Sequence, residues 1–306
     1  MLTVFQALAP VFLPILMGYA IRRYQWLDDG FWPPAERLTY RVLFPALLIA
    51  STARADLASD QVWAIAGTLF TVTLGVALLA LMLKPVLGID DAPFTSFFQG
   101  TIRPNTYVGM VPAFLFWGDE GVAMLSIAVL AVVPLVNLLS VTVLVIWGHG
   151  HEGARTPMKA VREVVRNPLV VACVVGFSLN ALHLGLPPVI MPLLDILGRA
   201  ALPIALMAVG AGLDFPDLVN NRWLAAKAST LKLLALPASA WALGTALGLE
   251  GQALHVTMLY ATLPMSASSY VLAREMGGDA PLAAGMITAS TLAAMLTMPV
   301  WIILSG

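Results

Sequence analysis

The fold is decided by two polar stretches, Arg103-Pro104-Asn105-Thr106-Tyr107 and Pro264-Met265-Ser266-Ala267-Ser268-Ser269-Tyr270, because each interrupts a long apolar segment. Proline removes a backbone donor and clashes with the preceding turn, so we expect one helix to break at Pro104 and another at Pro264. A break in apolar surroundings leaves N–H and C=O groups that protein or water must cover. The two stretches therefore predict a pair of polar positions inside an otherwise apolar protein.

The composition places these segments in a membrane. Of the 306 residues, 59% are hydrophobic and 11% are charged, whereas a soluble domain has about 25% charged residues. So little charge cannot cover a surface that faces water, and most of the surface must face lipid. The net charge of −1 gives no electrostatic reason to expect nucleic acid. A single cysteine, Cys173, excludes an internal disulfide, and we expect neither a metal site nor a cofactor.

The apolar runs are long and continuous, which indicates membrane-spanning helices and not alternating strands. A helix needs about 20 apolar residues to cross the hydrocarbon layer. We expect ten spans, near residues 2–21, 35–54, 61–83, 93–117, 121–147, 167–185, 189–212, 228–249, 251–273 and 281–305. The predicted fold class is an all-α polytopic membrane protein.

The distribution of Lys and Arg predicts the orientation of these spans. If the N-terminus lies outside, the outer loops hold one basic residue, Arg54, and the inner loops hold twelve. The twelve are Arg22, Arg23, Arg37, Lys84, Arg155, Lys159, Arg162, Arg166, Arg222, Lys227, Lys232 and Arg274. Because basic loops remain in the cytoplasm, we expect the N-terminus outside. The longest polar stretch, 149–166, is then a cytoplasmic linker between five spans in 1–148 and five in 167–306.

The two halves carry an internal repeat. Pro10, Gly18 and Pro45 recur 158 residues later as Pro168, Gly176 and Pro203, and Pro104 recurs 160 residues later as Pro264. The pair Gly118-Asp119 likewise matches Gly278-Asp279. With five spans in each half, the second copy must enter the membrane from the opposite side. Inverted repeats of this kind are typical of secondary transporters.

The order and spacing of several motifs resemble the auxin efflux carrier family. The motifs are Asn105-Thr-Tyr-Val-Gly109, Gly118-Asp-Glu-Gly121, Pro134-Leu-Val-Asn137, Asn167-Pro168, Leu202-Pro203-Ile-Ala-Leu206 and Gly210-Ala-Gly-Leu213. That family contains the plant PIN auxin carriers and bacterial transporters assigned to malonate, malate and related acids. The chain lacks the long central loop of many plant members and so looks like a bacterial form, for which the cytoplasmic (inner) membrane is the expected location.

The resemblance implies a ten-span fold related to the sodium–bile acid symporters. Spans one, two, six and seven would form a scaffold, and spans three to five and eight to ten a moving transport domain. The fourth and ninth spans would be broken and would cross each other at the membrane midplane. The resemblance also implies elevator-type alternating access and a possible homodimer formed through spans one, two and seven.

The two breaks are the predicted substrate-binding site. The N-terminus of each half-helix presents a positive dipole end that suits a carboxylate, and Asn105, Ser266 and Ser268 can donate hydrogen bonds to it. The resemblance implies substrate contact by Asn105, which follows the crossing proline, and by Asn137 in the fifth span. The alternative is that Asn105 and Ser266 only satisfy backbone groups freed at Pro104 and Pro264.

Arginines inside spans are expensive and usually face a partner or a cavity. Arg103 directly precedes the first break, where it either attracts an anion or pairs with freed carbonyls. Arg41 and Arg199 are repeat-related. For Arg199, an ion pair with Asp195 one helical turn earlier is one interpretation. The alternatives are an anion contact on the scaffold side and snorkelling toward the interface.

The predicted spans three to five and eight to ten contain no Asp or Glu in their interiors. We therefore expect that no buried carboxylate carries a driving proton, and the coupling ion stays open. No metalloprotease, nucleophile-elbow or P-loop motif is present, which argues against an enzyme or an ATP-driven pump. The expected function is secondary transport of small organic anions. A channel or a non-transporting receptor on the same fold is the alternative.

Overall fold

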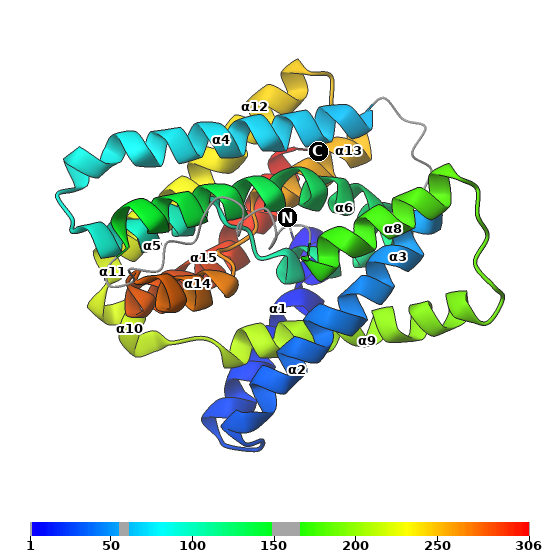
Figure 1. The fold of residues 1–306 in the computed structure, drawn as a ribbon, viewed down its shortest axis with the longest axis horizontal. Coiled ribbons are helices and arrows are strands. Elements are labelled where there is room, and N and C mark those ends of the chain that lie inside the picture. Colours follow the sequence, from blue (N-terminus) through cyan, green and yellow to red (C-terminus); the bar gives the residue numbers. More distant parts are fainter. Residues whose placement is uncertain (1, 55–60, 149–165, 306) are drawn as a thin grey trace.

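The computed structural model describes residues 2–54, 61–148 and 166–305 (Figure 1). Its α-helices are α1 (Leu2–Arg23), α2 (Trp32–Leu38), α3 (Phe44–Arg54), α4 (Gln61–Leu87), α5 (Asp91–Ile102), α6 (Thr106–Trp147), α8 (Pro168–Ala181), α9 (Ile190–Ala211), α10 (Phe215–Asn220), α11 (Arg222–Thr230), α12 (Leu236–Ala246), α13 (Gly251–Ala261), α14 (Ser268–Met276) and α15 (Ala280–Leu304). The predicted linker 149–166 lies outside the described residues except for Arg166.

Helices account for nearly all the described chain, and within it the sole β-type pairing is one isolated bridge. Four helices, α4, α6, α9 and α15, are each long and apolar enough to cross a bilayer. These features confirm an all-helical protein of the membrane type. Predicted spans two, four, eight and nine are each divided between shorter helices, and span six is the 14-residue α8, so the count of ten spans stays a prediction.

Both helices break at the predicted prolines. Helix α5 ends at Ile102 and α6 begins at Thr106, so Pro104 lies between them. Helix α13 ends at Ala261 and α14 begins at Ser268, so Pro264 lies in the second gap.

A third change of direction falls inside α6, at Gly118. This residue has φ 57° and ψ −143°, a conformation open to glycine because it has no Cβ. The position agrees with the boundary predicted between residues 117 and 121.

The helices gather into two packed groups. In the first, α1 packs along α9, and α3 packs against α8 and α9. In the second, α4 packs against α6 and α12, while α15 packs against α5, α10 and α11. Figure 1 shows the first group at the lower right of the view and most of the second at the upper left. Helix α6 contacts members of both groups.

Glycines allow the close approach of helices in the first group. A Cβ on Gly18 of α1 would overlap the backbone of Met207 in α9. A Cβ on Gly176 of α8 would overlap Thr52 and lie 3.1 Å from the carbonyl oxygen of Ile49 in α3. Both glycines are buried between helices, so their small size is a packing requirement at these two crossings.

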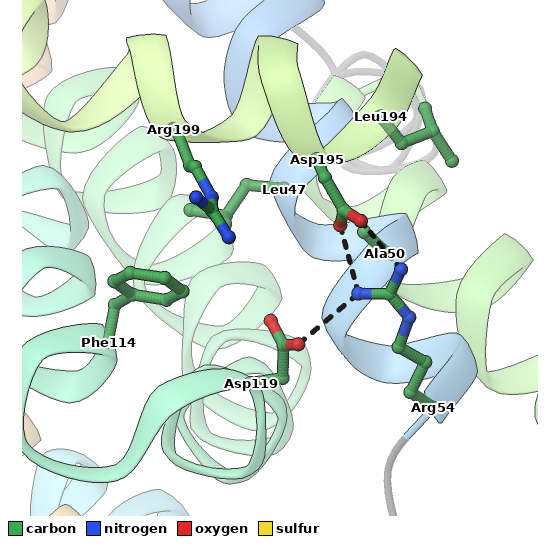
Figure 2. Close-up of a pocket in the computed structure, with 8 residues that line it drawn as sticks. All are labelled: Leu47, Ala50, Arg54, Phe114, Asp119, Leu194, Asp195 and Arg199. Carbon is green, nitrogen blue, oxygen red and sulfur yellow. Dashed lines mark hydrogen bonds and ion pairs between the residues drawn. The ribbon is translucent and has the colours of Figure 1, made fainter. Parts of the chain in front are cut away.

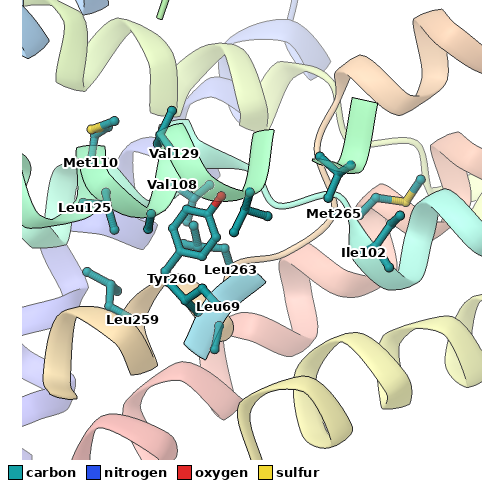
Figure 3. Packing of buried hydrophobic residues seen from close by; sticks show 14 of the residues in the cluster. Leu69, Ile102, Val108, Met110, Leu125, Val129, Leu259, Tyr260, Leu263 and Met265 are labelled. Atoms are coloured by element: carbon teal, nitrogen blue, oxygen red, sulfur yellow. The ribbon is translucent and has the colours of Figure 1, made fainter. Parts of the chain in front are cut away.

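The apolar core surrounds the two breaks. Figure 3 shows Ile102 and Val108, which flank the first break, near Leu263 and Met265 of the second. All four belong to one cluster of buried residues and are 0% exposed. The polar groups freed at the breaks are therefore enclosed by protein.

Candidate functional site

The two broken segments pair with each other. The backbone N–H of Asn105 donates to the carbonyl of Pro264 at 2.8 Å, and the N–H of Ser266 donates to the carbonyl of Arg103 at 3.1 Å. Between these bonds, Pro104 lies opposite Met265 in an antiparallel bridge. In a pair of this type neither central residue needs an N–H toward its partner strand, so the missing donor of Pro104 costs nothing there.

The remaining donor at the bridge is also satisfied. The N–H of Met265 points away from the paired strand and donates to the hydroxyl of Ser290 in α15 at 3.0 Å. That hydroxyl in turn donates to the carbonyl of Ile287 at 3.1 Å. The second break is thus attached to α15 as well as to the first break.

Asn105 uses one end of its amide for structure and leaves the other end available. Its side-chain oxygen accepts from the N–H of Tyr107 at 3.2 Å and caps the start of α6. Its Nδ2 is buried and has no hydrogen-bond partner among the described residues, and the residue is 2% exposed. Leaving a buried donor unsatisfied costs about 1–3 kcal/mol, so such donors usually serve a ligand or water.

A chain of polar side chains extends from the first break to the start of α14. The Nη2 of Arg103 donates to the hydroxyl of Ser268 at 2.9 Å, and the hydroxyls of Ser266 and Ser268 are 2.9 Å apart. Arg103 is 7% exposed, Ser266 is half-buried and Ser268 is exposed. The structure therefore brings together Arg103, Pro104, Asn105, Pro264, Ser266 and Ser268, six of the residues proposed from sequence.

Asn137 makes no hydrogen bond to this cluster among the described residues. It lies far along α6, partly buried, and no hydrogen bond within the described ranges connects it to the breaks. Its place in the site remains a prediction that rests on the resemblance.

Arg199 lies in a different pocket, lined by residues of α3, α6 and α9 (Figure 2). The predicted ion pair between Asp195 and Arg199 is wrong. Asp195 instead accepts two bonds from Arg54, at 2.9 Å and 2.7 Å, because Arg54 at the end of α3 reaches across to α9. Arg54 also contacts Asp119 at 3.3 Å. Arg199 has no ion-pair partner in the part of the chain that is described, and its side chain is exposed.

Sequence reasoning missed one charged group beside the breaks. The distribution of basic residues predicts Lys232 in an inner loop, but it is 1% exposed, and its Nζ lies 3.5 Å from the carbonyl oxygen of Ile102 at the end of α5. The assignment is wrong because the helix that contains Lys232 turns this side chain toward α5. The available signal was its place in the apolar run Leu231-Lys232-Leu233-Leu234, which allows no polar face.

Two basic side chains lie at the first break. Arg103 and Lys232 lie beside the end of α5, whereas α14 starts without a side-chain cap and α6 starts with the neutral Asn105. The N-terminal ends of α6 and α14 add partial positive charge. The arrangement offers cations, dipole ends and hydroxyl and amide donors, which is the set of groups that binds a carboxylate.

Comparison with known proteins points to membrane transport. A family model described as membrane transport protein matches residues 155–302. An uncharacterized transporter of Methanothermobacter thermautotrophicus is 26% identical over 297 residues, which cover 95% of this chain and 95% of the relative. Auxin efflux carrier component 5 of Arabidopsis thaliana is 26% identical over 311 positions, covering 90% of this chain and 88% of the relative.

A shorter match points the same way. The probable auxin efflux carrier component 5b of Oryza sativa is 28% identical over 150 residues, covering 47% of this chain and 41% of the relative. These matches, two of them over nearly the whole chain, support a membrane transporter of the auxin efflux carrier family.

Proposed function

We propose that this protein is a secondary transporter that moves small organic anions with a carboxylate group across the bacterial cytoplasmic membrane. The observation that carries the proposal is the buried Nδ2 of Asn105, which has no partner among the described residues at the junction of two broken helices. A carboxylate oxygen at that point would accept from Nδ2 and would lie close to the start of α6. Arg103, Ser266 and Ser268, which are linked to one another by hydrogen bonds, supply further donors at the paired breaks.

In the proposed mechanism, alternating access would arise from movement of one group of helices against the other. The proposed scaffold is α1, α3, α8 and α9, held by the close contacts at Gly18 and Gly176. The proposed transport domain is α4 to α6 and α11 to α15, which carries the paired breaks. Sliding of the second group past the first would expose the site to each side of the membrane in turn. In this proposal the ten spans form two five-span repeats, residues 1–148 and 167–306.

One pair of contacts supports the inverted repeat. Gly18 packs on Met207, and Gly176 packs on Ile49. Adding 158 to residues 18 and 49 gives 176 and 207, so the second contact is the first one with the two halves exchanged. An exchange of this kind is expected when two copies of one unit pack around a two-fold axis.

The proposal includes an orientation and an assembly. The N-terminus would lie outside, with the basic residues of the inner loops in the cytoplasm. A homodimer would form through spans one, two and seven. In its support, α1 and α9 carry exposed apolar side chains, among them Leu13 at 61% and Ile196 at 68%.

The test is binding followed by flux. Purified protein is screened by thermal shift against malonate, malate, acetate and indole-3-acetate, and any acid that stabilises it is used for uptake into liposomes. Uptake should saturate and should be accelerated by the same acid on the far side. Flux that rises linearly without exchange stimulation would indicate a channel, and binding without flux would indicate a receptor.

A further inference from the structure

Lys232 is a fully buried basic residue that the proposed mechanism has not used. It lies in the π-helical turn Leu231–Ala235 between α11 and α12, and its Nζ faces the carbonyl oxygen of Ile102 at 3.5 Å. Ile102 is the last residue of α5, so its carbonyl lies at the negative end of that half-helix. A buried ammonium needs compensation of this kind because its removal from water is costly.

The local sequence explains why this turn is irregular. Pro237 has no N–H, so the carbonyl four residues earlier, that of Leu233, loses its helical donor. The indole Nε1 of Trp301 in α15 donates to that carbonyl at 2.9 Å. The turn is therefore fixed to α15 on one side, while Lys232 extends toward α5 on the other. Single π-helical turns occur often at functional positions.

No carboxylate shares the surroundings of Lys232. The turn packs against α5, α11, α12 and α15. The charged side chains on these four helices are Asp91, Arg222 and Lys227. Asp91 lies at the far end of α5 and bonds Lys84 at 2.5 Å. Lys232 is thus placed to act on the broken segment itself and has no local acid to neutralise it.

We propose that Lys232 supplies, from within the chain, the positive charge that stabilises a bound anion at the breaks. Its ammonium takes the place at the end of α5 that a coupling sodium ion would otherwise occupy, so binding does not require sodium. This inference rests on the proposed function and makes it more specific, because it assigns the coupling cation to a side chain. Arg103, the neighbour of Ile102, adds to the same positive region.

The test compares variants of the full-length purified protein. Lys232→Met removes the charge at nearly constant length, and a buried charge replaced by an apolar side chain usually leaves the fold intact. Lys227→Met, an exposed lysine on α11, is the matched control. Malonate is titrated by thermal shift in NaCl and in choline chloride at equal ionic strength.

We expect wild type to bind malonate equally in the two salts. Lys232→Met should bind malonate at least about tenfold more weakly. A loss of this size is expected when one unit charge about 10 Å from the anion is removed at an effective dielectric constant of about 20. Lys227→Met should behave as wild type. Wild-type affinity in Lys232→Met, or sodium-dependent binding in wild type, would overturn the inference.

A second variant tests the role of Lys232 independently of the proposed transport function. Lys232→Ser opens space at the carbonyl end of α5, so NaCl should raise its melting temperature above that in choline chloride, with no such effect in wild type. This arm needs no substrate. If no carboxylate binds wild type, the proposed function fails, whereas stabilisation of wild type by sodium rejects the role of Lys232 alone.

Discussion

The backbone N–H of Asn105 donates to the carbonyl of Pro264 across 2.8 Å, although the two residues are 159 positions apart in the chain. With the reciprocal bond from Ser266 to Arg103, this contact joins the two broken helices at their open ends. The pairing satisfies two N–H and two C=O groups of the breaks with backbone partners alone. Side-chain donors such as the Nδ2 of Asn105 are therefore left for a ligand.

Replacement of Asn105 should remove ligand binding by losing one donor. Asn105→Asp keeps an oxygen that can cap the N–H of Tyr107, but it removes Nδ2 and adds a negative charge beside the anion. We expect no measurable thermal shift with malonate and a melting temperature close to that of wild type. Asn105→Ala should lose binding too, and the lost cap should cost about 1 kcal/mol of stability.

Asn167 provides the matched control. Its side chain caps α8 by accepting from the N–H of Leu169 at 2.9 Å, as Asn105 does for α6, but it lies in the scaffold group. Asn167→Ala should lose a similar amount of stability and keep ligand binding. If Asn105→Asp bound malonate as wild type does, Asn105 would have no role beyond capping.

The glycine crossings should be sensitive to a single methyl group. Gly18→Ala and Gly176→Ala each force a Cβ into a neighbouring helix, and overpacking of this kind costs about 1–3 kcal/mol. Gly75 on α4 has open space around its Cβ position, and Gly75→Ala should stabilise slightly, by about 0.5–1 kcal/mol. Melting temperatures in one detergent would compare the three. Equal stability in all three variants would show that the scaffold helices can separate at these points.

The sequence predicted features that depend on the backbone and missed those that depend on side-chain direction. Proline acts on its own helix, so the breaks at Pro104 and Pro264 were predictable, and the boundary expected between residues 117 and 121 agrees with the change of direction at Gly118. The partner of Asp195 could not be predicted, because Arg54 is distant in sequence and Arg199, one helical turn away, was the nearer candidate. The burial of Lys232 depends on a π-helical turn that sequence periodicity does not report.

The indole of Trp301 should be important to the second half of the protein. Trp301→Phe removes the donor to the carbonyl of Leu233, which Pro237 cannot replace. An unsatisfied buried carbonyl costs about 1–3 kcal/mol, and the melting temperature should fall accordingly. Trp241→Phe, on an exposed face of α12, is the control and should change stability little. Equal melting temperatures for the two variants would mean that another group or water replaces the indole.

The contact between α3 and α6 offers a direct test of movement between the two helix groups. The hydroxyl of Ser51 donates to the carboxylate of Asp119 at 3.0 Å, and Arg54 adds a partly exposed ion pair to the same carboxylate. Exposed pairs contribute little to stability, typically 0–1 kcal/mol. A contact of this kind can therefore break during a transport cycle, which a covalent bond in its place would prevent.

Cysteines at these two positions should lock the carrier. In a background with Cys173→Ala, which removes the single native cysteine, Ser51→Cys with Asp119→Cys places two thiols where the native side chains touch. We expect oxidation to stop uptake of the identified acid and reduction to restore it, while each single-cysteine variant stays active under both conditions. Because a disulfide prevents relative displacement of α3 and α6, full uptake by the cross-linked protein would show that transport does not require these helices to slide.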